Sequence, residues 1–400
     1  VLHSLSKYSM NFIGLIRDAS GGWDFSYDER KHYYYNILKY WNTVLAKFKP
    51  DVIVFFTWPH TQACYPLYLL CKHHFKMEVL FIDPSPLLDQ NCHFVGTSLE
   101  SLHSPFMAVY ESDEVITPSK STMDYLLNLR GKHSKQPKYL DEIYHRDKNT
   151  KQVLIHDFIW LAISTCIKGT GFKNGDYDYK KNRKPYDDLK SRMNNFDILF
   201  YMEKSRRKNI KLAKIYKKFC MNADYTKKFV FFAAPYQPEA VTATNAGVYE
   251  ELFLVLDVLS DSVPDDWIIF YKEHPSTFLE HFQGHYRRNK RVYERIESYK
   301  NIQIIPSETD TIKLIDNSQA VCTVGGTTGW ESIVRGKPAL AFGNVWYQGC
   351  KSIFTINTLK EIQEAISAIC NGYLPDEKDI DRYTAAVEKI TEKNIVMDNF

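Results

Sequence analysis

Short runs of β-branched and aromatic residues alternate along this chain with longer stretches in which apolar and polar residues recur at helical spacing. Such alternation is typical of α/β proteins with parallel sheets. The runs fall into two sets, so the pattern predicts two sheets. The predicted strands are residues 11–16, 51–57, 78–82 and 114–117 in the first set, and 228–233, 267–272, 302–305, 320–324 and 339–342 in the second.

The spacing of these runs also predicts the domain organisation. Residues 136–226 separate the two sets, are rich in Lys, Asp, Asn and Tyr, and predict a mostly helical interdomain region. A chain of 400 residues can bury two hydrophobic cores. We therefore expect an N-terminal domain with a helical insertion over residues 1–226, a C-terminal domain over 227–380, and a final helix over 381–400 that packs back on the N-terminal domain.

Composition and charge exclude several classes of protein. The net charge of +3 and the pI near 8.2 do not require a nucleic-acid partner, which usually goes with a domain pI above about 9. The eight cysteines are scattered and predict reduced thiols in a cytoplasmic protein. No run is long and apolar enough for a membrane span, and no signal peptide is recognisable. The sequence does not begin with Met, as expected for a module of a longer protein.

Residues 203–218 form a strongly basic stretch, with eight Lys or Arg residues and one acid. One interpretation is a patch for acidic membrane lipid or for an anionic acceptor. The alternative is a solvated helix face whose apolar stripe packs on the core, and general experience with charged helices favours it. The stripe consists of Ile210, Leu212, Ile215 and Phe219.

A polar segment follows the predicted strand 267–272. Lys272, Glu273, His274 and Ser276 come together there, and Pro275 restricts the backbone of the histidine. Ligands of open parallel sheets bind at the carboxyl ends of strands, so these four side chains are predicted to contact a ligand. Lys272 suits a phosphate, and His274 can donate to a phosphate or protonate a leaving group. The alternative for His274 is a histidine that caps the strand end.

A glycine-rich segment follows the predicted strand 320–324 and precedes a helix. Its glycines allow close approach of an anion, its threonines add donors, and the helix begins there, so it predicts a phosphate-binding loop. It has neither the Walker spacing nor the dinucleotide fingerprint. Glu331 can bind a ribose diol, or it can be an acid that the helix dipole stabilises in the first turn. Trp346 can pack on a ligand or in the core. The loop residues are Gly325, Gly326, Thr327, Thr328 and Gly329.

A third polar loop follows the predicted strand 228–233 and contains Tyr236, Gln237 and Glu239. Because this strand begins the second domain, its loop is expected to face the cleft between domains. Tyr236 and Gln237 are predicted substrate contacts, and Glu239 is a candidate base or nucleophile. The alternative for Glu239 is a solvated loop carboxylate.

The three segments, taken in this order and spacing, resemble the capsule polysaccharide biosynthesis family. The motifs are Tyr-Gln-Pro-Glu at 236–239, Lys-Glu-His-Pro at 272–275, and Gly-Thr-Thr-Gly-Trp-Glu at 326–331 followed by Gly-Lys-Pro at 336–338. This family includes the bacterial 3-deoxy-manno-octulosonate (Kdo) transferases and related enzymes of GT-B fold. The resemblance covers about residues 228–347, and the motif set is far more specific than any one motif.

The resemblance implies an α/β, GT-B-like fold in which two Rossmann-like domains face a cleft. It makes His274 the contact to the donor phosphate, Thr327 and Thr328 the phosphate loop, and Glu331 a ribose or sugar contact. It also favours a CMP-sugar donor such as CMP-Kdo. The chain departs from the family at one point. Kdo transferases carry an acidic pair just after the segment that corresponds to residues 236–239. Ala240 and Val241 stand there, so Glu239 is a candidate substitute.

The same resemblance places the acceptor mainly on the N-terminal domain, which can then supply the general base. His60 follows the predicted strand 51–57 and is the candidate catalytic imidazole. Asp83 follows the predicted strand 78–82 and is the candidate acid. For both residues the structural alternative, capping of the next helix, is favoured.

The function that these features predict is transfer of a sugar from a nucleotide-sugar donor to a saccharide or lipid-linked acceptor, with no cofactor and no protein-held metal. The only Asp-x-Asp tripeptides, at 176–178 and 379–381, lie in polar surroundings. Alternatives are a UDP-sugar donor, a glycerophosphotransferase using CDP-glycerol, a sugar-nucleotide epimerase and a non-catalytic nucleotide-sugar scaffold. Nucleic-acid binding is the weakest alternative.

Overall fold

The computed structural model describes most of the chain. Residues 6–26, 132–172 and 179–194 are the longest stretches outside the description, and the predicted strand 11–16 falls among them. The described residues are 5, 27–85, 87, 92–131, 173–174, 177–178, 195–237, 239, 241–279 and 284–393.

The C-terminal half forms a six-stranded parallel sheet in the order β11-β10-β9-β6-β7-β8. Five of the strands confirm the predictions from sequence within one or two residues, and the sixth, β11, is too short for its pattern to be recognised. Their bounds are β6 Phe229–Ala233, β7 Ile268–Lys272, β8 Ile302–Ile304, β9 Ala320–Thr323, β10 Ala339–Ala341 and β11 Phe354–Thr355.

Helices cover both faces of this sheet because successive strand residues point to opposite faces. On one face Val230, Phe232 and Ile269 pack against α8 and α9; on the other, Phe231 and Phe270 pack against α11. This two-sided burial explains why the strands read as nearly continuous apolar runs. The helices are α8 Asn195–Phe219, α9 Leu252–Ser262, α10 Lys290–Glu297, α11 Thr311–Asn317, α12 Thr328–Val334 and α13 Leu359–Cys370.

The order of the strands creates a switch point between β6 and β9. The chain runs outward from β6 through β7 to β8, returns to the other side of β6 as β9, and continues through β10 to β11. This is the doubly wound order in which ligands bind at the carboxyl edge of the sheet, beside the switch point. The fold therefore marks the loops after β6 and β9 as the place for a ligand.

The N-terminal half contains a smaller, mixed sheet in the order β1-β2-β3-β12. β1 and β2 are parallel, whereas the β2–β3 and β3–β12 pairs are antiparallel. The strands are β1 Val52–Phe55, β2 Glu78–Pro84, β3 Cys92–Gly96 and β12 Glu392–Lys393; two further strands, β4 Lys173–Asn174 and β5 Tyr177–Asp178, form a separate pair.

The prediction of a strand at 114–117 is wrong, because these residues form no strand and Val115 is 90% exposed. Sequence reasoning missed both β3 and β12; β12 lies within residues 381–400, for which a helix was predicted. The N-terminal helices are α3 Tyr27–Phe48, α4 Cys64–Leu69, α5 Ser104–Tyr110 and α6 Lys120–Arg130, with a π-helical turn, η2 Leu70–Phe75, after α4.

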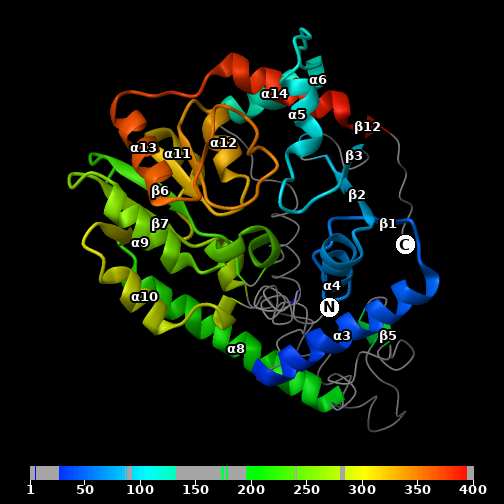
Figure 1. The fold of residues 1–400 in the computed structure, drawn as a ribbon. Helices are drawn as coiled ribbons and strands as arrows, with labels where there is room; N and C mark the ends of the chain where they lie inside the picture. Colours follow the sequence, from blue (N-terminus) through cyan, green and yellow to red (C-terminus); the bar gives the residue numbers. More distant parts are fainter. Residues whose placement is uncertain are drawn as a thin grey trace.

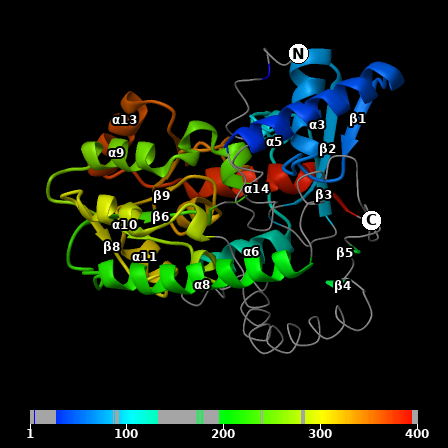
Figure 2. The same cartoon turned by 90° about the horizontal axis from the view of Figure 1, so that it is seen from below.

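The helix α14, Glu377–Ile390, connects the two halves of the molecule. It packs along α5 and also contacts α6, as both views show (Figures 1 and 2). The Arg382 guanidinium donates to the carbonyls of Tyr110, Ser112 and Glu114, and Lys389 forms an ion pair with Glu114. The expected α/β fold with two sheets is confirmed, while the exact domain limits stay a prediction.

The basic stretch 203–218 lies on α8, with its two faces clearly different. Leu212 and Tyr216 are buried in the core, and the side chain of Asn209 is buried as well. The exposed side chains on the opposite face are Lys204, Arg207, Lys208, Lys211, Lys214, Lys217 and Lys218. The predicted packing of an apolar stripe is thus confirmed for Leu212. Among the helices in the described part, none is long and apolar enough to span a membrane.

Candidate functional site

The three polar segments predicted from sequence come together at the carboxyl edge of the larger sheet. Ala233 at the end of β6 pairs with Lys272 of β7 on one side and with Thr323 of β9 on the other. The loops that follow these strands are therefore neighbours. This juxtaposition follows from the parallel order, which the sequence predicted only in outline.

Lys272 is a buried cation at this edge. Its Nζ donates to Thr311 Oγ1 at 2.5 Å and lies over the Phe231 ring. Burial lowers the pKa of Lys272 to about 8, against the opposing effect of the nearby carboxylates Asp310, Glu308 and Glu331. Lys272 thus supplies a positive charge from which solvent is largely excluded.

His274 is held in one tautomer. The backbone N–H of Ser276 donates to His274 Nδ1 at 3.2 Å, so the neutral ring carries its proton on Nε2. Burial, followed by the positive charge of Lys272, lowers the pKa of His274 to about 4. At neutral pH the imidazole is therefore an uncharged hydrogen-bond donor through Nε2.

The glycine-rich segment is packed closely against its surroundings. Gly326 N donates to Thr323 Oγ1 at 3.2 Å, and Tyr347 Oη donates to Gly326 O at 2.6 Å. A Cβ on Gly329 would lie 2.5 Å from Tyr347 Oη, so this glycine is required by packing at the start of α12. The phosphate-binding role predicted for the loop stays a prediction.

Thr327 and Glu331 contact one another across the first turn of α12. Thr327 Oγ1 donates to Glu331 Oε1 at 2.9 Å. Burial raises the pKa of Glu331, although the Thr327 hydrogen bond and the charges of Arg335 and Lys272 act in the opposite direction. Glu331 therefore already has a partner at the helix start, and a ribose would have to compete with it or share it.

The loop after β6 contains one half-buried carboxyl. Burial raises the pKa of Glu239 to about 7, so near neutral pH this side chain can give or accept a proton. Its backbone carbonyl accepts hydrogen bonds from Ala243 and Thr242, which fix the turn. Tyr236 is half-buried in the same loop.

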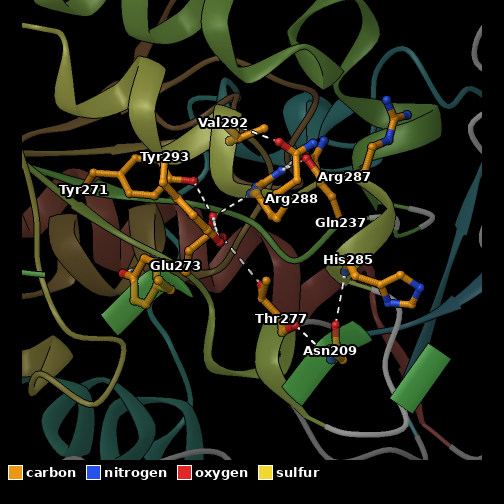
Figure 3. Close-up of polar contacts among 12 residues, drawn as sticks. Asn209, Gln237, Tyr271, Glu273, Thr277, His285, Arg287, Arg288, Val292 and Tyr293 are labelled. Carbon is orange, nitrogen blue, oxygen red and sulfur yellow. Dashed lines mark hydrogen bonds and ion pairs between the residues drawn. The ribbon is translucent and has the colours of Figure 1, made fainter. Parts of the chain in front are cut away.

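Glu273 and Gln237 lie inside a buried polar network instead of at the surface of the cleft (Figure 3). The Glu273 carboxylate forms an ion pair with Arg288 and also accepts from the Tyr271 hydroxyl at 2.6 Å. Arg288 donates to Gln237 Oε1 at 2.9 Å. Arg288 is the residue that sequence reasoning missed. Its only signal was a pair of arginines, at 287–288, in a segment without strand or motif character.

A cavity of about 90 Å³ lies between the two sheets. The smaller sheet and its loops supply mostly aromatic and apolar walls together with one carboxyl, and the larger sheet supplies the glycine-rich loop. The lining residues are Trp58, Asp83, Pro84, Phe94, Leu102, Asn245, Gly325, Gly326, Thr327, Asn344, Val345, Trp346 and Tyr347. Trp346 and residues 325–327 thus reach the cavity, whereas Lys272, His274 and Glu239 do not line it.

The two N-terminal candidates are placed differently. Asp83 lines the cavity, accepts from Thr57 Oγ1 at 3.3 Å, and has its pKa raised by burial to about 6. His60 is not among the lining residues; its Nδ1 lies 2.7 Å from Trp58 O, and burial lowers its pKa. The position of Asp83 favours it over His60 as the residue that faces the glycine-rich loop.

The two aspartates of the second Asp-x-Asp tripeptide have structural partners. In the second Asp-x-Asp tripeptide, Asp379 accepts from Ser352 at 2.8 Å and Asp381 pairs with Arg130. Within the described ranges, no group of three or more His, Cys, Asp or Glu side chains could hold a metal ion. The first tripeptide, at 176–178, lies partly outside the described residues.

Comparison with solved structures gives remote matches. A Kdo 2,4 transferase domain of Thermosulfurimonas dismutans KpsC has a TM-score of 0.35 at 11% identity, covering 84% of this chain and 86% of that one. A Kdo 2,7 transferase of the same protein has 0.32 at 12%, covering 81% and 79%. The UDP-GlcNAc 2-epimerase of Methanocaldococcus jannaschii has 0.30 at 12%, covering 92% and 82%. At these TM-scores the matches carry no argument about this chain.

Comparison by sequence gives a family. No curated protein matches the chain. Residues 177–352 match the capsule polysaccharide biosynthesis protein family, and this range contains all three motifs at the carboxyl edge of the larger sheet. The resemblance to the capsule polysaccharide biosynthesis family is therefore confirmed over residues 177–352.

Proposed function

We propose that this protein is a glycosyltransferase that moves a sugar from a nucleotide-sugar donor to a saccharide or lipid-linked acceptor in capsule or surface polysaccharide synthesis. One observation carries the proposal. The loops after β6, β7 and β9, all within the family-matched range, meet beside the switch point of a doubly wound sheet, with Lys272, His274 and the glycine-rich loop among them.

In such a transfer the phosphate leaving group gains negative charge, which the site must stabilise. The bond between the anomeric carbon and the phosphate oxygen breaks with its electron pair on the phosphate, while the acceptor hydroxyl bonds to the carbon and loses its proton. Lys272, the Nε2–H of His274 and the amides of the glycine-rich loop can stabilise this phosphate. We propose that they do so without a metal held by the protein.

The proton of the acceptor hydroxyl needs a base. Burial raises the pKa values of Glu239 and Asp83 to about 7 and about 6, and neither shares its carboxyl with the glycine-rich loop as Glu331 does through Thr327. Asp83 faces the cavity from the smaller sheet, which favours it for an acceptor bound there. His60, the predicted catalytic imidazole, is the weaker candidate.

The donor nucleotide is proposed to be cytidylate, as in CMP-Kdo, on the strength of the histidine-proline pair and the family resemblance. The decisive experiment is calorimetric titration of the purified protein with CMP and with UDP, repeated on His274→Ala. We expect CMP to bind, and the substitution to weaken it about 10- to 100-fold because a hydrogen bond to a charged group is lost. A preference for UDP would show that the donor is a UDP-sugar and not a CMP-sugar.

Binding of neither nucleotide would contradict the proposal. Transfer is tested separately with a radiolabelled donor: label reaches the acceptor with a glycosyltransferase or a CDP-glycerol-type glycerophosphotransferase, but not with an epimerase or a non-catalytic scaffold. Unaltered polysaccharide synthesis in cells that carry either His274→Ala or Glu239→Ala would count against catalysis.

We further propose that the exposed basic face of α8 contacts anionic lipid, so that the protein acts at the inner face of the membrane. Among the described residues, two acids pair with this stretch: Glu203 with Arg206 and Arg207, and Glu308 with Lys217 at 3.7 Å; no ion pair is seen for the other exposed cations of the face. Changing Lys204, Lys208, Lys211 and Lys214 to Gln should weaken binding to phosphatidylglycerol vesicles at least about ten-fold, since each cation near such a surface contributes about 1 kcal/mol.

The matched control for this test changes four exposed lysines on other elements, Lys290, Lys300, Lys360 and Lys378, to Gln. Equal loss of vesicle binding in both variants would assign the effect to net charge and contradict a role of the α8 face. Vesicles of phosphatidylcholine alone should bind neither protein.

A further inference from the structure

A buried arginine joins the two loops that carry the candidate catalytic groups. Arg288, which is 4% exposed, donates through Nε to the Glu273 carboxylate and through Nη1 to Gln237 Oε1 at 2.9 Å (Figure 3). Glu273 directly precedes His274 in the loop after β7, and Gln237 lies two residues before Glu239 in the loop after β6. One guanidinium therefore bridges both loops.

Each partner of Arg288 is itself fixed by further contacts. The Glu273 carboxylate also accepts from the hydroxyls of Tyr271 and, at 3.4 Å, Tyr293. Gln237 Nε2 donates to the carbonyl of Glu250 at 2.8 Å, and the Glu250 carboxylate forms an ion pair with Arg287. The bridge is thus part of a connected network, in which a shift of either loop would break buried hydrogen bonds.

The loop after β7 is also held from the side of α8. Tyr216 Oη accepts the backbone N–H of Glu273 at 3.1 Å, and Asn209 Nδ2 donates to the carbonyls of Thr277 and Leu279. These contacts fix the loop on one side only. Toward the loop after β6, Ala234 N donates to Lys272 O at 3.0 Å where the two strands end, and Arg288 connects the residues near His274 and Glu239.

Stability alone is a poor explanation for this arrangement. A buried ion pair can often be replaced by apolar side chains without loss of stability, because the desolvation of both charges offsets their attraction. Arg288 Nη2, moreover, is buried and has no hydrogen-bond partner in the described part of the chain. What arginine offers over an apolar residue is a planar fork that holds two acceptors at fixed angles. Its contribution here is therefore geometric.

We propose that Arg288 is a positioning residue, which fixes the loops after β6 and β7 relative to one another and thereby orients the His274 imidazole and places Glu239. Gln237 and Glu273, predicted from sequence as ligand contacts, then act on the site through Arg288. The inference rests on the proposed function for the roles of His274 and Glu239, but the orientation of the imidazole can be measured without any ligand.

The test uses two variants of the full chain that break the bridge with little risk to folding. Arg288→Lys keeps a positive charge beside Glu273 but cannot hold both acceptors. Gln237→Ala removes the hydrogen bond between Arg288 and Gln237 and leaves the buried ion pair with Glu273 intact. In folded protein, we expect each to weaken CMP binding about 10-fold, and the double variant no more than the stronger single variant, because both break the same bridge.

Arg130→Lys provides the matched control. Arg130 also holds two carboxylates, Glu377 and Asp381; it joins α6 to α14, donates to the Val334 carbonyl at the far end of α12, and touches neither loop. A merely structural role predicts the same outcome for Arg130 and Arg288: a lower melting temperature with unchanged CMP affinity. The positioning role predicts that only the Arg288 and Gln237 variants lose affinity.

The second readout is the NMR spectrum of the His274 ring in the free protein, which remains informative even if neither CMP nor UDP binds. In the parent protein we expect the proton on Nε2 and a pKa near 4, with Lys272 as the charged neighbour. In Arg288→Lys the loosened loop should admit water, raise the pKa toward its ordinary value and weaken the tautomer preference. Folded Arg288→Lys protein with an unchanged tautomer and pKa at His274 would overturn the inference.

Discussion

The two sheets of this protein differ in how completely they are buried. Strands β6, β7 and β9 lie in the middle of a parallel sheet with helices on both faces, and almost all of their side chains are buried. Among the described strands of the smaller sheet β1 lies at the edge, and its Val52 and Val54 are 39% and 44% exposed. Full burial on both faces imposes an apolar pattern on a strand; a partly exposed strand is under no such constraint, although β1 keeps an apolar sequence.

The same two regions contribute different chemistry to the site. The larger sheet brings Lys272 and His274, which are donors suited to a phosphate. The smaller sheet brings Trp58, Phe94 and Asp83, which are suited to a ring with a hydroxyl that loses a proton. The following predictions compare equivalent features of the two regions, beginning with the largest expected effect.

Removal of a buried ion-pair partner should have the largest effect. Glu273→Ala leaves the Arg288 guanidinium without its carboxylate and the hydroxyls of Tyr271 and Tyr293 without an acceptor. We expect the free energy of unfolding to fall by about 3–5 kcal/mol, as for other broken buried pairs. Urea titration followed by circular dichroism measures it. A loss below about 1 kcal/mol would mean that the network is much looser than described.

Substitution of two tightly packed glycines should distinguish an effect on stability from an effect on ligand binding. A Cβ on Gly329 of the larger half would lie 2.5 Å from Tyr347 Oη, and a Cβ on Gly96 of the smaller half would lie 2.2 Å from the Phe81 ring. Either substitution by Ala should cost about 1–3 kcal/mol through overpacking. Only Gly329→Ala should also weaken CMP binding, because it shifts the glycine-rich loop. Equal loss of CMP affinity in both variants would contradict this division.

The two buried carboxyls should make stability depend on pH in the same direction. The folded-state pKa values of Asp83 and Glu239, about 6 and about 7, lie above their unfolded values. Each carboxyl therefore contributes stability that is fully present below its unfolded pKa and is lost as the pH rises through the folded value. Asp83→Asn and Glu239→Gln should thus raise stability by about 1–2 kcal/mol at pH 8.

At pH 4 the same two variants should show no gain, because both carboxyls are then protonated in the folded parent protein. Thermal melts across pH 4–8 measure the difference. A gain that is equal at both ends of the range would show that packing or hydrogen bonding, and not ionisation, is responsible.

The smallest effect is expected for an exposed pair in the smaller region. His73 Nε2 lies 3.9 Å from Glu100 Oε1, and the Glu100 side chain is 53% exposed. His73→Ala should change the free energy of unfolding by less than about 0.5 kcal/mol, since solvent screens such pairs. It should also leave CMP affinity unchanged, which makes it a histidine control for His274→Ala. A cost comparable to that of Glu273→Ala would remove the contrast between the regions.

Predictions from the sequence were more accurate for the larger, fully buried sheet than for the smaller one. Five strands of the larger sheet were predicted almost to the residue, because each is a short apolar run bounded by polar loops. In the smaller sheet β1 and β2 were predicted, β3 and β12 were missed, and a strand at 114–117 was wrongly expected. Cys92–Gly96 contains a histidine and ends in glycine, whereas Val115 and Ile116 resemble a strand but lie in an exposed connection.

At the site, local sequence patterns predicted some residues and not others. Lys272, His274 and the glycine-rich loop were recognisable because their residue types suit phosphate and because each follows a strand. Asp83 was named as a candidate, but its position opposite residues 325–327 depends on how the two sheets face each other. Arg288 carried no motif, since its partners lie 15 and 51 residues away in sequence.

Local sequence patterns were sufficient to predict the α/β class, the parallel strands of the larger sheet and the polar segments at their ends. Local periodicity and residue chemistry are sufficient for these, because burial on two faces and the turn after each strand act within a few residues. Only the tertiary structure decided which polar side chains face the cavity and which, like Glu273 and Gln237, are enclosed by partners. That distinction depends on contacts between distant segments, whose free energies come from desolvation and geometry that no local pattern encodes.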